Sequence, residues 1–174
     1  MKRIWLSCLI LLLLAVPALG VPATITSFQT GPWNATATWV GETVPTSEDV
    51  GIIANGHIVT IPDGVTASFA GTVEDVAGIN ISAGGTLVVA SGGTVNIGPG
   101  LANLTNSGTL TVASGGVLTV GTAGAICHGT AGVPGATTIA GTLTVTAGGH
   151  FKVDIAGATC TVSGAVAVGG TSAR

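Results

Sequence analysis

Residues 85–97 read GTLVVASGGTVNI, and two later segments repeat its pattern, with GTL, a valine two positions later and a pair of glycines at the same places. Residues 108–120 read GTLTVASGGVLTV, and residues 141–153 read GTLTVTAGGHFKV. A fourth copy begins at Gly164 with GAVAVGG, and the four starting points lie 23, 33 and 23 residues apart. Repeats of this length are typical of solenoids, in which each turn buries its apolar face only by stacking on a neighbouring turn.

Aliphatic and small polar residues alternate within each repeat, which is the period of a β-strand with one buried face. Paired glycines at 92–93, 115–116 and 148–149 separate the strands and permit sharp corners between them. About three short strands and three corners fit into one repeat. We therefore predict an all-β chain that folds as a right-handed parallel β-helix, with about 23 residues per coil.

Aligning the repeats at their first glycine predicts which side chains stack on one another in the core. The following columns are expected to be buried: Leu87, Leu110, Leu143 and Val166; Val89, Val112, Val145 and Val168; Val95, Leu118 and Phe151; Ile97, Val120 and Val153. The 33-residue step carries ten extra residues, and removal of 128–137 (HGTAGVPGAT) restores the shorter spacing. Insertions in solenoids map to loops at the corners, so an inserted loop is expected there.

Residues 1–20 have the composition of a secretory signal peptide. Lys2 and Arg3 precede an apolar core at 4–16, and Ala18 and Gly20 form a small-x-small cleavage site. The apolar core is shorter than the ~20 residues that span a bilayer. We therefore predict a secreted or cell-surface protein. Cleavage leaves seven acids against two bases, a formal charge of −5 that disfavours nucleic acid and anionic membranes as partners.

The segment that follows is unlike the repeats. Residues 27–62 read SFQTGPWNATATWVGETVPTSEDVGIIANGHIVTIP and contain both tryptophans that lie outside the signal peptide. An open solenoid end exposes core and strand edges, so it needs a capping segment. We predict that 21–65 form the N-terminal cap and first coil, and that 66–174 form the remaining coils.

The order of residues in this segment resembles the start of many secreted bacterial parallel β-helix proteins and of the extracellular eight-glycine (G-eight) domain family. Their pattern, W…TW.G..P…D.V.I..GH.V.I, is matched here by Trp33, Trp39, Pro45, Asp49, Gly56 and His57. The resemblance implies an extracellular parallel β-helix, sometimes attached to polysaccharide-acting or adhesive modules, and does not imply catalysis. Glu42 departs from the pattern, because a second glycine is common at its position.

Two pairs of residues are candidates for a specific role. Trp33 and Trp39 either stack on sugar rings of a ligand or plug the open end of the solenoid. Cys127 and Cys160 occupy the same offset in successive repeats. That offset predicts stacking, as buried free thiols or as a coil-to-coil disulfide.

The acids and histidines form no recognisable constellation, so we expect no catalytic residues, no metal site and no cofactor. We predict a structural or adhesive module without catalytic activity of its own. The alternative is a carbohydrate-binding or polysaccharide-acting module, whose partner would be an extracellular polysaccharide. Gly164 opens a repeat of which eleven residues are present, so its turn is expected to lie open. Either the sequence is part of a longer protein, or this turn stacks on another chain.

Overall fold

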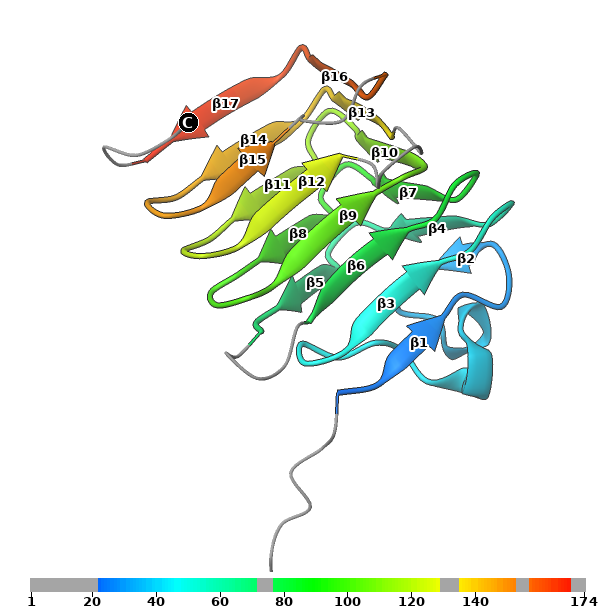
Figure 1. Cartoon of the computed structure of the whole chain (residues 1–174). Helices are drawn as coiled ribbons and strands as arrows, with labels where there is room; N and C mark the ends of the chain where they lie inside the picture. Colours follow the sequence, from blue (N-terminus) through cyan, green and yellow to red (C-terminus); the bar gives the residue numbers. More distant parts are fainter. Residues whose placement is uncertain (1–21, 72–76, 129–134, 153–156, 170–174) are drawn as a thin grey trace, which may run out of the picture.

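A computed structural model describes residues 22–71, 77–128, 135–152 and 157–169. The chain winds through three parallel sheets that run side by side along the molecule (Figure 1). Each turn contributes one strand to every sheet, and corresponding strands start 22 to 28 residues apart. The predicted all-β fold, a solenoid of stacked parallel strands, is therefore confirmed.

Strand bounds follow the three sheets. The first sheet contains β1 (Thr24–Thr26), β3 (Val50–Ile53), β6 (Gly78–Ile81), β9 (Asn103–Asn106), β12 (Ala125–His128) and β15 (His150–Lys152). The second sheet contains β2 (Gly31–Pro32), β4 (Ile58–Ile61), β7 (Thr86–Val89), β10 (Thr109–Val112), β13 (Ala136–Ile139) and β16 (Thr159–Val162). The third sheet contains β5 (Thr66–Phe69), β8 (Thr94–Ile97), β11 (Val117–Val120), β14 (Thr142–Val145) and β17 (Ala165–Val168).

Two short 3-10 helices, η1 (Thr36–Thr38) and η2 (Val40–Glu42), lie in the N-terminal cap together with β1 and β2. The first complete turn consists of β3, β4 and β5. It therefore ends at Phe69, a few residues beyond the boundary expected at residue 65.

The core is a set of aliphatic ladders in the middle of the solenoid. Alternate residues of each strand point inward, and like side chains stack because successive strands pair without a shift of register. In the second sheet, Val59, Leu87 and Leu110 form one such ladder, and all three are buried. Full burial of an aliphatic side chain stabilises a protein by about 1.5–3 kcal/mol, so these ladders dominate the stability of the coils.

The predicted columns pair the first two repeats correctly, and they also pair the valines of the fourth repeat correctly with Leu143 and Val145 of the third, but they wrongly join the third repeat to the second. Leu87 and Leu110 pair as expected, but Leu143 lies in the third sheet opposite Leu118. The same error moves Val145 and Val166 to the third sheet, and it moves Phe151 to the first sheet opposite Ile126. Val153 lies outside the described residues. Although their sequences agree, the segments at 108 and 141 therefore occupy different faces.

The misalignment has a physical origin in the second sheet of the fourth turn. At the position that follows Leu87 and Leu110, β13 carries Thr137, which is buried although polar. Its hydroxyl oxygen accepts a 3.0 Å hydrogen bond from the side-chain amide nitrogen of Asn106. Asn106 is itself fully buried. A hydrogen-bonded pair thus replaces a leucine, and the next leucine along the chain belongs to another face.

The predicted inserted loop at 128–137 is wrong at both ends. His128 is the last residue of β12, and Ala136 and Thr137 open β13. Its middle, 129–134, lies outside the described residues. Aligning the repeats at their first glycine puts the register on the wrong face, so strand residues of β12 and β13 are mistaken for an insertion.

We expect that Asn106→Ala lowers the free energy of unfolding by about 1–3 kcal/mol, because buried polar groups lose their partners. Asn106 donates hydrogen bonds to the Ala136 carbonyl and the Thr137 hydroxyl, and it accepts one from the Gly108 amide. Urea denaturation measures the loss. Asn103→Ala is the matched control on the outward face of the same strand, and an equal loss in both variants would contradict this account.

Candidate functional site

The N-terminal end of the solenoid is closed by a cluster of aromatic rings. Trp33 and Trp39 are both buried, and their ring centroids lie 4.7 Å apart in an edge-to-face contact. The Trp33 ring makes a second edge-to-face contact with Phe69 at 5.7 Å, which joins the cap to the third sheet. The indole nitrogen of Trp39 donates a 2.7 Å hydrogen bond to the carbonyl of Trp33. These contacts support the plug, and the buried rings offer no face on which a sugar could stack.

A buried carboxylate fastens the chain entering the cap. Asp49 accepts hydrogen bonds from the Thr46 amide at 2.7 Å, the Thr46 hydroxyl at 2.7 Å and the Ala23 amide at 2.9 Å. Burial alone would raise the pKa of Asp49, but the bonds from Thr46 and Ala23 outweigh it and hold the pKa below its ordinary value. Asp49 is therefore ionised at neutral pH and ties Ala23, which precedes β1, to the turn before β3.

A second polar link joins β1 to the corner between β3 and β4. The Ser27 hydroxyl lies 2.8 Å from Nδ1 of His57 and accepts a 2.9 Å hydrogen bond from the Ala54 amide. Trp33, Trp39, Asp49 and His57, which carry the sequence pattern of the cap, thus all hold the cap together. A structural role in the cap therefore explains these four side chains without a ligand.

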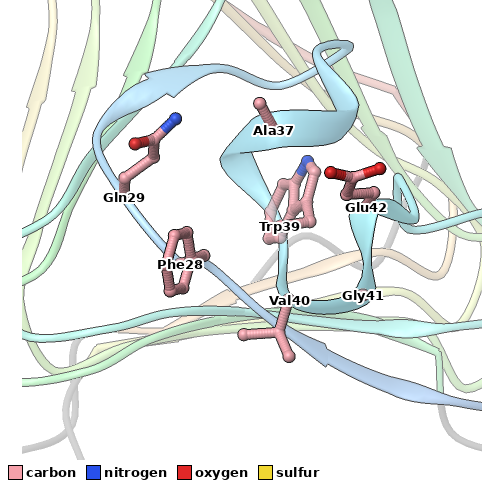
Figure 2. Close-up of a pocket in the computed structure, with 7 residues that line it drawn as sticks. All are labelled: Phe28, Gln29, Ala37, Trp39, Val40, Gly41 and Glu42. Carbon is pink, nitrogen blue, oxygen red and sulfur yellow. The ribbon is translucent and has the colours of Figure 1, made fainter.

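A cleft of about 310 Å³ opens on the outer side of this plug. Its lining residues are Phe28, Gln29, Ala37, Trp39, Val40, Gly41 and Glu42. Figure 2 shows Phe28 and Gln29 along one side, Glu42 on the opposite side, and Trp39 between them. The side chain of Phe28 is 67% exposed, although aromatic side chains are usually largely buried. Aromatic residues make up only 3% of the sequence.

Glu42 reaches the rim of this cleft through an unfavourable backbone conformation. Its φ is +54°, a left-handed value that glycine adopts without strain and that other residues adopt rarely. The preceding Gly41 has a φ of +74°. A second glycine at position 42 would therefore fit this turn, and the glutamate is held in it at a cost of about 1–3 kcal/mol.

The sequence did not point to Phe28 or Gln29 as site residues. A usable signal was present, since Ile25 and Ser27 are buried and the alternation of a strand would turn Phe28 outward. Among the aromatic side chains that the structure describes, Phe28 alone is exposed. However, the pairing of Phe28 with Glu42 depends on the path of η1 and η2, which no spacing rule predicts.

A second hollow of about 150 Å³ lies on the outer face of the first sheet. Its lining includes Gly78, Asn80, Asn103 and Thr105. Neither an aromatic ring nor a charged group lines it, so the cleft in the cap is the stronger candidate for a binding site.

The predicted stacking of Cys127 on Cys160 is wrong. Cys127 lies in the first sheet with Thr105 and Lys152 as its register neighbours, whereas Cys160 lies in the second sheet opposite Thr137. The step from β9 to β12 is one residue shorter than the sequence alignment assumed, so Ile126 takes the place opposite Leu104. Neither a disulfide nor a ladder of thiols joins the two positions, and Cys160 is a free thiol whose pKa is raised by burial.

In the part of the chain that the structure describes, no three His, Cys, Asp or Glu side chains gather closely enough to hold a metal ion. The described residues also include no helix with the length and apolar character needed to cross a membrane. No family model, curated protein or solved structure is significantly similar to this chain.

We expect the contribution of Asp49 to the free energy of unfolding to disappear in acid. Because its folded pKa is lowered, this stability is fully present above the ordinary value of 3.8 and is lost as the pH falls through the folded pKa. At pH 7, Asp49→Asn should lower the free energy of unfolding by about 1–3 kcal/mol. Urea denaturation from pH 7 to pH 3 checks this, and a gap to wild type that stays constant would contradict it.

Proposed function

We propose that this chain is a secreted or cell-surface structural and adhesive module without catalytic activity of its own. The observation that carries the proposal is the difference between the two ends of the described solenoid. The first turn is plugged by Trp33 and Trp39, whereas the last described turn leaves its inward-facing valines uncovered. Solenoid surfaces of this kind associate with other chains unless something covers them.

The exposure of the last turn is clearest in the third sheet. Val166 pairs with Leu143, and Val168 pairs with Val145. Leu143 and Val145 are 3% and 6% exposed, whereas Val166 and Val168 are 53% and 51% exposed. One further strand paired with β17 would bury both valines and hydrogen-bond the backbone groups along the free edge of β17. A second chain could supply that layer by self-association, and so could further coils of a longer protein.

The long outward faces suit adhesion better than catalysis. Seven threonines cover the outside of the second sheet, namely Thr60, Thr86, Thr109, Thr111, Thr138, Thr159 and Thr161. Hydroxyl and methyl groups thus repeat at the strand spacing of about 4.8 Å. Charged residues make up only 6% of the sequence, so such faces contact partners with little repulsion.

Secretion is proposed from the composition of residues 1–20, and the relation to the G-eight domain family from the pattern between Trp33 and His57. The alternative function, a carbohydrate-binding or polysaccharide-acting module, is favoured by one observation. The cap cleft places an exposed aromatic ring beside an amide and a carboxylate.

Light scattering coupled to size-exclusion chromatography tests self-association of the chain from residue 21 onward. We expect a mass above the monomer that rises with concentration. Val166→Lys combined with Val168→Lys should shift it to the monomer, because the lysines place charge on the uncovered core.

Ala165→Lys with Ala167→Lys is the matched control, since these side chains alternate with the valines on β17 and face outward. It should leave association unchanged. A wild-type chain that stays monomeric at the highest concentration measured would refute assembly through this turn. Circular dichroism of each variant verifies that the coils are folded.

A further inference from the structure

We propose that the cap cleft binds a neutral pyranose unit of an extracellular glycan, with Phe28, Gln29 and Glu42 as its contact residues. The inference deepens the adhesive function proposed above, and it rests on that function for the presence of glycans where the protein acts. It does not depend on self-association, because the cleft lies at the opposite end of the solenoid from β17 (Figure 1).

The walls of the cleft are held in place by the protein itself. Backbone amides of Phe28 and Gln29 both donate to the Thr38 carbonyl, at 2.7 and 3.4 Å, and Ser27 forms an antiparallel bridge with Trp39. Trp39 also lines the cleft, and its buried indole is fixed by a hydrogen bond to the Trp33 carbonyl. The site is therefore preorganised, so a ligand binds without the entropic cost of ordering these walls.

The lining suits a sugar ring more closely than other small ligands. The exposed ring of Phe28 and the exposed side chain of Val40 offer an apolar surface to the C–H groups of a pyranose. The Gln29 amide both donates and accepts hydrogen bonds, and the Glu42 carboxylate accepts two or more from hydroxyl groups. Among the described residues, none forms a hydrogen bond or ion pair with either side chain, so both are available.

Other ligand classes match the lining less well. The carboxylate of Glu42 repels an anion. A purely apolar ligand would desolvate that carboxylate without a hydrogen bond. A cation could pair with Glu42 and lie on Phe28, but it would leave the donor groups of Gln29 unused.

The backbone at Glu42 supplies an independent argument. The left-handed conformation at φ +54° favours glycine, and within the described part of the chain the Glu42 carboxylate stabilises nothing. A side chain kept in a strained position without a structural partner is typical of binding sites, where function opposes stability. Its carboxylate faces the cleft from the side opposite Phe28 (Figure 2).

This argument predicts an unusual variant. Glu42→Gly should raise the melting temperature or leave it unchanged, because glycine relieves the strain, and it should weaken glycan binding at least about tenfold. Phe28→Ala should weaken binding similarly. Glu48→Gln is the matched control, since Glu48 is an exposed acid of the cap outside the cleft, and it should bind like wild type.

The measurement begins with an array of neutral glycans, followed by NMR titration of the chain from residue 21 onward with the strongest binder and its methyl pyranoside. We expect shifts confined to the cleft residues and lost in Glu42→Gly. Absence of binding to every neutral glycan at about 10 mM would overturn the proposal, as would binding that Glu42→Gly leaves intact.

Titration with N-acetyl-arginine amide tests the cationic ligand. Binding of this compound in the cleft, without any binding of neutral glycans, would also overturn the proposal. Light scattering of Glu42→Gly separates the two proposals, because assembly through β17 should persist whether or not the cleft binds sugar.

Discussion

Each turn of this chain lies in register on the turn before it, and the rest of the structure depends on that stacking. A single turn has too few residues to enclose its own aliphatic side chains, so Leu110 is buried only because Leu87 lies beneath it. At both ends of the described solenoid, the terminal turn lacks a neighbouring turn on one side. At the first turn, the tryptophan plug and the Asp49 and Ser27 hydrogen bonds replace the missing neighbour. At the last turn, the strand edge and valines of β17 stay uncovered, and they carry the proposal of assembly.

The cap combines two roles within a few residues. Trp39 packs inward on Trp33 and is also one of the residues that line the outer cleft. The turn that leads away from it carries Glu42 in a conformation better suited to glycine. In an otherwise regular molecule, this is the place where local strain, an exposed aromatic ring and an unused carboxylate coincide. The threonine-rich sheets supply a rigid body, and the cleft supplies a place where one chemical group can be selected.

The sequence was sufficient for the type of fold and insufficient for its register. Alternation of aliphatic and small residues is a local property, so strands, corners and the capping segment could be predicted from it. Register is not local, because the second and third faces carry nearly the same pattern, GTLTV at 108–112 and GVLTV at 116–120. Replacement of a leucine by Thr137, supported by Asn106, then moved the apparent match to the wrong face. The expected pairing of Cys127 with Cys160 fails for the same reason, because Cys127 lies in the first sheet and Cys160 lies in the second. The cleft could not be predicted, because Phe28 and Glu42 meet through two irregular helical turns.

The register of the fourth turn on the third is the most direct point at which to test this account. Methyl groups of leucine can be labelled selectively, and nuclear Overhauser contacts between them report which leucines are neighbours. The account predicts a strong contact between Leu118 and Leu143, a second between Leu87 and Leu110, and none between Leu110 and Leu143. A strong contact between Leu110 and Leu143 would contradict it, because the two strands would then share a face.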